Sequence, residues 1–236
     1  MEAVAVDAGG AGEFRPEFCR LATRFGGKMG AVYHRRMATV AGDVTVFILA
    51  GGKSTRMGTD KTFVMLEGRT LLARMLELVR SVCAEVRIVG DRAKFAGFAP
   101  SVEDIFPGCG PLGGIHAALR SSQTDLNLML AVDMPFVSAA FLEFLTKRAR
   151  ESDATVTLAR TRDGLQPLCA VYRRAFGELA EKALRAGHYK IDALFDETQT
   201  QVIEEEELRA AGVSSELFRN LNTPRDLARA KDSGVR

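Results

Sequence analysis

Short apolar runs alternate with amphipathic segments along most of the chain. The run "VTVFILA" at residues 44–50 is apolar throughout, which is typical of a strand buried on both faces of a sheet. Four further runs have a similar character. The predicted strands cover residues 44–50, 85–91, 126–133, 154–160 and 167–173.

Helical periodicity fills the segments between these runs. In "TLLARMLELVRSVCA", residues 70–84, five apolar side chains fall on one helical stripe: Leu71, Leu72, Met75, Leu76 and Val79. The predicted helices cover residues 70–84, 113–122, 139–152, 174–187 and 222–232. Gly187 is a suitable helix stop, and Thr223 followed by Pro224 is a typical helix start. The acidic run 204–208 is interpreted as the solvated first turn of another helix.

Alternating strands and helices predict an α/β fold, in which a mostly parallel central sheet has helices on both faces in a three-layer, Rossmann-like arrangement. In such sheets ligands bind beyond the carboxyl ends of the strands. No linker interrupts the pattern, so residues 37–236 are expected to form a single domain. Residues 1–36 are rich in Gly, Ala and Arg without a sustained period, and are expected to be a disordered extension, with Met37 as a possible true start.

Composition narrows the class of protein. Of the 236 residues 47% are hydrophobic and 26% charged, as in a soluble globular protein, and the net charge of +2 does not favour a nucleic-acid or membrane-surface binder. No apolar run approaches the ~18 residues of a membrane span. The four cysteines form no C-x-x-C pair, which argues against a zinc site and a disulfide framework and favours a cytoplasmic location.

A glycine-rich loop, "LAGGKSTRMGTDK" at residues 49–61, follows the first strand. It contains "GKST" but is not a P-loop, because the required first glycine would fall at Phe47. Gly51 and Gly52 allow close backbone approach to a ligand, and successive N–H groups can hold an anion. Arg56 and Lys61 add cationic groups for phosphate oxygens. The pattern favours a phosphate-binding loop over a surface turn with solvated cations.

A second glycine motif, "GCGPLG", has the G-x-G-x-x-G spacing of a dinucleotide-binding site at residues 108–113, with Asp133 20 residues beyond Gly113. That fingerprint needs a strand directly before it, whereas the preceding segment is short, charged and closed by Pro107. A dehydrogenase would also leave the first loop unexplained. The sequence therefore disfavours a dehydrogenase.

Asp133 ends the predicted strand 126–133, so its carboxylate is expected to project into the cleft that the first loop lines. Magnesium is commonly held by one or two carboxylates together with phosphate oxygens, which makes Asp133 the candidate metal ligand. The alternative is a turn or helix-capping aspartate.

The loop 49–61 resembles the signature of the nucleotidyltransferases, and most closely that of the molybdenum cofactor guanylyltransferases. The resemblance extends through "VEDIFPGCGPLGGIHAAL", "LAVDMPF", "QPLCAVY" and "NLNTPRDL", covering about residues 44–231. It implies transfer of GMP from GTP to the phosphate of molybdopterin or its molybdenum-bearing form, with Mg²⁺ as cofactor. Related cytidylyltransferases tend to have L-A-A-G in the loop, so Gly52 favours GTP.

The resemblance also implies roles for individual residues. The expected nucleotide-binding residues are Leu49, Ala50, Gly51, Gly52, Lys61, Asp104 and Asp133. The expected catalytic residues are Arg56, Lys61 and Asp133, with Asp133 also binding the metal. The expected acceptor-binding residues are Gln166, Asn220 and Asn222. Asp104 has a physical reason for its role, because a carboxylate can accept two hydrogen bonds from a guanine edge.

Some points stay open at the level of sequence. The family often has an asparagine at the end of the second strand, where this chain has Val89 and Gly90, so a backbone group or Asp91 has to replace that contact. The arginines at 160, 162, 173 and 174 either help to bind an anionic acceptor or are solvated surface charges. Alternative functions are transfer with CTP or to a sugar phosphate, and nucleotide binding without turnover. Molybdoenzymes and other cofactor-biosynthesis proteins are candidate partners, and whether a molybdoenzyme docks to receive the product stays open.

Overall fold

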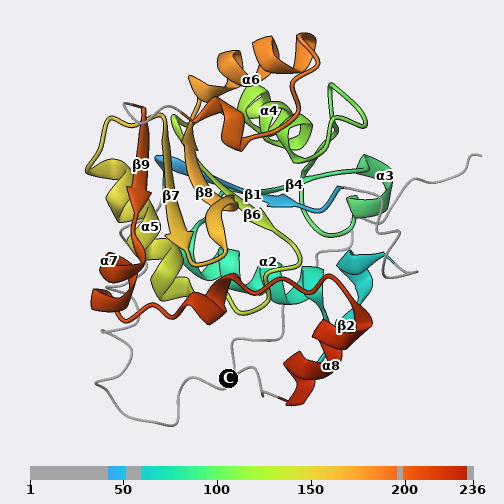
Figure 1. Ribbon diagram of the computed structural model, residues 1–236. Helices are drawn as coiled ribbons and strands as arrows, with labels where there is room; N and C mark the ends of the chain where they lie inside the picture. Colours follow the sequence, from blue (N-terminus) through green and yellow to red (C-terminus); the bar gives the residue numbers. More distant parts are fainter. Residues whose placement is uncertain (1–41, 52–59, 196–198, 233–236) are drawn as a thin grey trace, which may run out of the picture. The chain divides into compact units, whose positions relative to one another are not determined.

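A seven-stranded sheet forms the centre of the computed structural model, which describes residues 42–51, 60–195 and 199–232 (Figure 1). The strands are β1 (Val44–Leu49), β4 (Val86–Val89), β5 (Ser101–Val102), β6 (Leu126–Ala131), β7 (Val156–Thr161), β8 (Gly164–Arg173) and β9 (Thr200–Ile203). Their order is β5-β4-β1-β6-β8-β7-β9, and β8 alone runs antiparallel to its neighbours in this sheet. The predicted α/β class with a mostly parallel sheet is confirmed.

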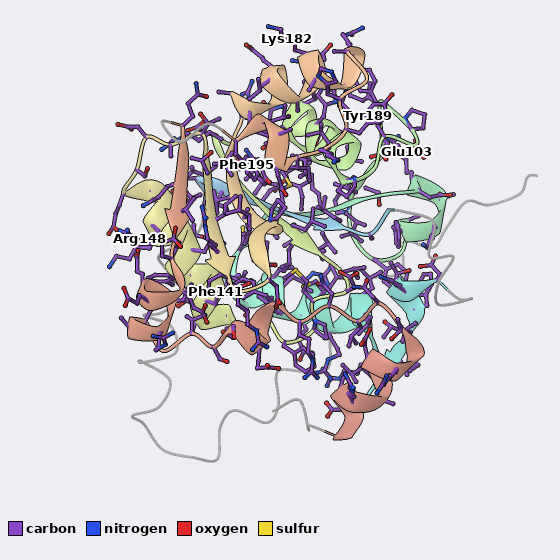
Figure 2. The ribbon with its side chains drawn as sticks, in the orientation of Figure 1. Glu103, Phe141, Arg148, Lys182, Tyr189 and Phe195 are labelled. Carbon is purple, nitrogen blue, oxygen red and sulfur yellow. The ribbon has the colours of Figure 1, made fainter. Side chains whose placement is uncertain are left out.

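Helices cover both faces of the sheet. Helices α2 (Leu71–Val82) and α5 (Ala139–Arg150) pack on one face, and α4 (Pro111–Ser121) and α6 (Phe176–Arg185) on the other (Figure 1). Each face has its own hydrophobic core, with Phe141 of α5 in one and Phe195 packed against the other (Figure 2). The Leu71, Leu72, Met75, Leu76 and Val79 stripe is buried, as its spacing predicts.

The strands and helices predicted from periodicity are all present, and the acidic run 204–208 does open a helix. The remaining elements are short: a β2 (Met65–Leu66) and β3 (Arg69–Thr70) hairpin, α3 (Arg92–Phe95), α7 (Glu205–Ala210), α8 (Pro224–Asp232) and the 3₁₀ turns η2 (Lys61–Phe63), η3 (Asp192–Leu194) and η4 (Ser215–Phe218). Sequence analysis missed β5, β9, α3 and the hairpin, because two to four residues are too few to show a period.

The described residues all fall within one unit, Thr39–Arg236. The proposed extension 1–36 and the domain boundary at residue 37 lie outside the described residues and stay predictions. Among the helices that the structure describes, none combines the length and the apolar character needed to cross a membrane.

The strand order reverses at β1: strands that follow β1 are first added on one side of it and then on the other. From β1 the chain passes through α2 to β4 on one side, and it later returns through α4 to β6 on the other side of β1. The two connecting helices lie on opposite faces of the sheet, so the crossovers diverge at this point (Figure 1). Such a switch point leaves a crevice at the carboxyl ends of the two strands, and this edge of the sheet, called here the carboxyl edge, is where a ligand is expected.

Gly90 makes the turn from β4 into α3 possible. Its φ of +155° is rarely adopted by residues with a Cβ, and a Cβ placed there would lie 2.7 Å from a ring carbon of the fully buried Phe95. Its N–H continues the sheet by donating to the carbonyl of Val102 at 2.9 Å. The family asparagine expected near this position therefore has no room at residue 90.

Replacing Gly90 tests this turn. Gly90→Ala is expected to lower the free energy of unfolding by about 2 kcal/mol, from backbone strain together with overpacking against Phe95. Chemical denaturation measures the loss. Gly97→Ala is the matched control, since a Cβ at residue 97 meets no described atom within 4 Å. Equal stability of the two variants would contradict the assignment.

Candidate active site

The carboxyl ends of β1 and β6 form the floor of the candidate site. Beyond the last pair of the register, Leu49 with Ala131, the carbonyl of Leu49 accepts from the N–H of Val132 at 3.2 Å and the N–H of Ala50 donates to Val89 at 3.0 Å. Gly51 follows as an exposed residue, and a Cβ there would meet only the Val89 carbonyl oxygen, at 3.8 Å, among described atoms. The described packing does not itself demand glycine at residue 51.

Lys61, Asp133 and Asn222 meet at this edge. The Nζ of Lys61 donates to Oδ2 of Asp133 at 2.9 Å and to Oδ1 of Asn222 at 2.6 Å. The side chains of Lys61 and Asp133 are each 19% exposed, so their charges are partly withdrawn from water but still reached by it. These three residues, called the Lys61 cluster below, come from η2, the turn after β6 and the loop before α8.

The C-terminal loop is fixed against β6, which explains how Asn222 reaches Lys61. The N–H of Leu221 donates to the carbonyl of Asp133 at 2.9 Å. Thr223 and Asp226 form a reciprocal cap at the start of α8: Thr223 Oγ1 accepts from the N–H of Asp226 at 3.2 Å, and Asp226 Oδ2 accepts from the N–H of Thr223 at 2.8 Å. The predicted helix start at Thr223 and Pro224 is thus confirmed. The T-x-x-D spacing was the sequence signal for Asp226, which the analysis missed.

Asp104 lies at the other side of the crevice, beyond β5. Its carboxylate oxygen would be 3.5 Å from a Cβ placed on Gly114, which also faces Val89 and Leu49. The side chain keeps contact with solvent, but burial on this packed side raises the pKa of Asp104 above its ordinary value. No described residue donates a hydrogen bond to it, so the carboxylate is available to a ligand. Gly114 lies in the segment "VEDIFPGCGPLGGIHAAL", through which the family resemblance extends.

The glycines of "GCGPLG" shape the entry to α4 and do not form a dinucleotide fingerprint. No described strand directly precedes them, since β5 ends at Val102. Gly110 is the residue before the helix, with a φ of +69°, and Pro111 occupies its first turn. A Cβ at Gly113 would lie 3.0 Å from the carbonyl of Phe106, so the loop packs directly on the helix. This geometry is inconsistent with a dehydrogenase site.

The other residues expected at the site form no described bond with the Lys61 cluster. Gln166 lies at the start of β8, which reaches the carboxyl edge because β8 is antiparallel, but its Nε2 donates within the hairpin to Thr161 Oγ1 at 3.1 Å. Asn220 is exposed, and its side chain forms no hydrogen bond with a described residue. The predicted residues Gly52 and Arg56 lie outside the described residues.

The four arginines whose role the sequence left undecided lie in two different places. Arg173 and Arg174 lie at the end of β8, on the edge of the sheet opposite to the Lys61 cluster, where Arg173 pairs with Asp125. They are not placed to bind an acceptor. Arg160 and Arg162 are nearer the carboxyl edge, exposed on or after β7, and pair with Glu204 at 3.4 Å and Asp163 at 4.0 Å.

A divalent cation would find one protein carboxylate in this site. Among the described residues no group of three or more His, Cys, Asp and Glu side chains could hold a metal by itself. Oδ2 of Asp133 accepts a hydrogen bond from Lys61, and Oδ1 of Asp133 accepts none from a described residue. A single carboxylate completed by substrate phosphates and water is the donor set that suits a hard cation such as Mg²⁺, so the residues present fit it.

Comparisons with known proteins give a consistent picture. A family described as MobA-like NTP transferase domain matches residues 46–202. The chain is 36% identical to a molybdenum cofactor guanylyltransferase of Desulfosudis oleivorans, over 80% of this chain and 94% of that protein. It is 34% identical to a probable molybdenum cofactor guanylyltransferase of Pelotomaculum thermopropionicum, over 79% of this chain and 91% of that protein. The crystal structure of molybdopterin-guanine dinucleotide biosynthesis protein A from Archaeoglobus fulgidus superposes with a TM-score of 0.71 at 31% identity, covering 80% of this chain and 97% of that one.

The environment of Asp104 predicts a pH-dependent effect on stability. Because the pKa of Asp104 is raised in the folded protein, the fold loses stability as the pH rises through that pKa and Asp104 ionises. Asp104→Asn is therefore expected to melt at a higher temperature than the parent protein at pH 7, with the difference closing as the pH falls below the pKa of an unfolded aspartate.

Melting temperatures of Asp104→Asn and the parent protein, measured between about pH 3.5 and pH 7, test this effect. The range brackets the pKa of an ordinary aspartate, which is about 4. Asp163→Asn is the matched control, because the Asp163 side chain is 80% exposed. A stabilisation by Asp104→Asn that does not change with pH would contradict the assignment.

Proposed function

The chain belongs to the MobA-like NTP transferase family, and on that premise we propose that it is a molybdenum cofactor guanylyltransferase. It transfers GMP from GTP to the phosphate of molybdopterin or its molybdenum-bearing form, and it releases pyrophosphate. The substrates are supported by the activities for which relatives are named, and the chain covers more than nine-tenths of each of them. The Lys61 cluster at the switch point of the sheet is the structural observation that carries the proposal.

The reaction needs alignment and charge neutralisation more than proton transfer. The acceptor phosphate is already ionised, so its oxygen attacks the α-phosphorus of GTP without a strong general base, and the bond to pyrophosphate breaks. Gly51 leaves room for the triphosphate at the end of β1. Lys61, held from two sides, offers its ammonium to the phosphate oxygens as negative charge develops on the leaving group. Arg56 has the same proposed role.

Asp133 is the residue proposed to hold Mg²⁺, with substrate phosphates as the remaining ligands. When bound there, the ion withdraws charge from the α-phosphate and from the leaving pyrophosphate. Asp133 and Lys61 then act on opposite charges in one small region, the carboxylate towards the cation and the ammonium towards the phosphates. The backbone bond from Leu221 to Asp133 keeps this turn in place.

Base and acceptor recognition are assigned to two sides of the crevice. Asp104 is proposed to accept hydrogen bonds from the guanine edge, since its carboxylate has no described donor of its own. Leu49, Ala50 and Gly52 complete the proposed nucleotide site. Gln166, Asn220 and Asn222 are proposed for the acceptor, and for Asn222 the contact with Lys61 adds a second role.

We further propose that residues 37–236 form the catalytic domain and that the reaction takes place in the cytoplasm. The described cysteines, Cys83, Cys109 and Cys169, are free thiols, as suits a reducing compartment. Delivery of the product to a molybdoenzyme is part of the same proposal.

Pyrophosphate release tests the function directly. With Mg²⁺ and GTP, release is expected only after molybdopterin or its molybdenum-bearing form is added, together with formation of the guanine dinucleotide. CTP is expected to react at least ~10-fold more slowly in kcat/KM, because a site built around hydrogen bonds rejects a base that leaves them unpaired. Equal use of CTP, or release with a sugar phosphate instead, would assign another transferase. Nucleotide binding without release would indicate a regulatory protein.

Removing members of the Lys61 cluster is expected to reduce turnover. Lys61→Ala should lower kcat by ~10²- to 10³-fold, as loss of one preorganised electrostatic contact does, and Asp133→Ala should abolish turnover in Mg²⁺. Steady-state kinetics measure both effects. Lys182→Ala is the matched control, since Lys182 is an exposed lysine of α6, away from the site (Figure 2). Normal turnover of Asp133→Ala would reject its metal role.

A further inference from the structure

The turn that presents Lys61 is itself fixed by Asp60, the residue before it. Asp60 caps η2: its Oδ1 accepts from the N–H of Thr62 at 3.0 Å and from the Thr62 hydroxyl. The buried Thr62 anchors the turn to the core, since its side chain is almost completely covered. The position of Lys61 therefore depends on the carboxylate of Asp60 staying where it is.

The second oxygen of Asp60 is held by a residue from a different part of the chain. Lys94 of α3 donates from Nζ to Oδ2 of Asp60, 34 residues away in sequence. The same ammonium lies over two aromatic rings, 4.6 Å from the centroid of Phe95 and 5.4 Å from that of Phe63. Two rings and a carboxylate around one ammonium restrict it far more than an ordinary surface ion pair would.

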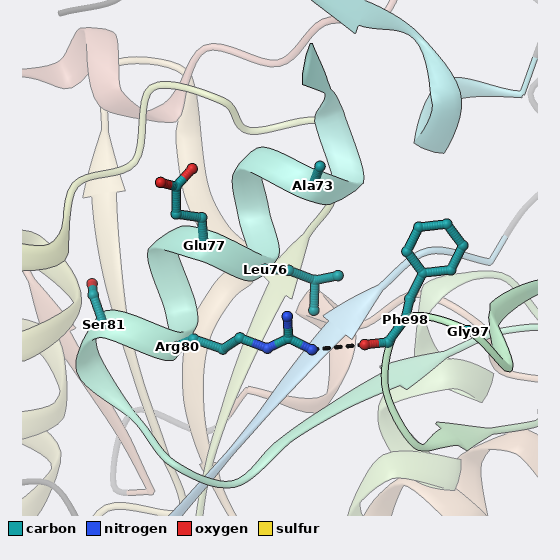
Figure 3. Close-up of a pocket in the computed structure, with 7 residues that line it drawn as sticks. All are labelled: Ala73, Leu76, Glu77, Arg80, Ser81, Gly97 and Phe98. Atoms are coloured by element: carbon teal, nitrogen blue, oxygen red, sulfur yellow. Dashed lines mark hydrogen bonds between the residues drawn. The ribbon is translucent and has the colours of Figure 1, made fainter. Parts of the chain in front are cut away.

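Helix α3 gives Lys94 a rigid base. Asp91 caps the helix by accepting from the N–H of Lys94 at 3.0 Å, and Phe95 is fully buried against Gly90 at the end of β4. After α3 the chain is bonded to α2, because Arg80 Nη2 donates to the carbonyl of Phe98 at 2.7 Å. Figure 3 shows this bond at the side of an open hollow of about 560 Å³, and the Phe98 ring stands beside Phe63, with centroids 6.0 Å apart.

The charge of Asp60 agrees with this arrangement. Burial opposes ionisation of Asp60, but hydrogen bonds from Lys94 and Thr62 outweigh it and keep its pKa below the ordinary value. The lowered pKa favours the charged carboxylate that pairs with Lys94.

We propose that Lys94 is a positioning residue for the transfer reaction, which sets the place of Lys61 by holding Asp60 and the η2 turn against α3. Lys94 does not touch the substrate. It ties the η2 turn, which presents Lys61, to α3 at the end of β4. This inference rests on the proposed function, and its test needs one readout that does not depend on that function.

The kinetic test compares four single variants and one double variant. Lys94→Met removes the charge and keeps the length of the side chain, and is expected to lower kcat about 10-fold with the KM for GTP within about 2-fold, as a small displacement of a catalytic group does. Lys94→Arg should keep most of the activity. Asp60→Asn should show a loss similar to that of Lys94→Met, and the double variant should be no worse than the poorer single one.

Arg92→Met is the matched control for charge, because Arg92 lies on the same helix, is exposed, and its side chain forms no hydrogen bond or ion pair with a described residue. Wild-type kcat in Lys94→Met, a loss no larger than in Arg92→Met, or losses that multiply in the double variant would each overturn the inference. A melting temperature that falls while kcat does not would assign Lys94 a role in stability alone.

The second readout is the reactivity of Lys61 towards an amine-acylating reagent, followed by mass spectrometry of the peptides without any substrate. Lys94→Met is expected to raise acylation of Lys61 several-fold, since the ammonium of Lys61 would no longer be held at Asp133. Acylation of Lys182 should be unchanged and serves as the internal reference. An unchanged rate at Lys61 would overturn the inference even if kcat fell. A raised rate in a protein that transfers no GMP would uphold the positioning and reject the proposed function.

Discussion

Parallel pairing of β1 with β6 is the constraint from which the candidate site follows. The register sets Leu49 beside Ala131, so both strands reach the carboxyl edge together and Gly51 and the Asp133 turn follow at the same level. The connections that leave β1 and enter β6 run over opposite faces of the sheet, and this keeps the space beyond the ends of the two strands open. Lys61 and Asn222, 161 residues apart in sequence, both reach that space. A change in the order of these two strands would separate every member of the cluster.

Charge balance governs the state of the site before substrate binds. Lys61 and Asp133 are partly buried, and a charge in such a place is stabilised only with a partner. Each supplies the other, while Oδ1 of Asn222 accepts a further hydrogen bond from the ammonium. In the proposed reaction a phosphate and a divalent cation present the same two signs of charge, so substrate binding would replace one set of pairings by another without leaving either group unpaired. On that proposal, the pair is preorganised for an anion that arrives with a cation.

The base side of the crevice shows the opposite balance. Asp104 is kept where packing disfavours its charge, and no described residue offers it a hydrogen bond. Gly90 accepts a close contact with Phe95 that a Cβ would prevent, and a Cβ on Gly114 would lie 3.3 Å from Cγ1 of Val89. Departures from local rules of this kind concentrate where a protein binds its ligand, because stability is given up for a carboxylate that is ready to accept donors.

The sequence by itself determined the long elements, the class of fold and the edge at which chemistry should occur. Apolar periodicity reports which side of a segment is buried, and the carboxyl ends of parallel strands share one edge, so Lys61 and Asp133 could be expected near each other. The spacing at Phe47 also excluded a P-loop. Only the tertiary structure decided that β8 runs antiparallel, which brings Gln166 to the site edge and takes Arg173 away from it. It also decided that Asn222 bonds to Lys61 and that Lys94 bonds to Asp60. These contacts join side chains on separate elements, and a periodic pattern records the burial of each element but not the neighbour against which it packs.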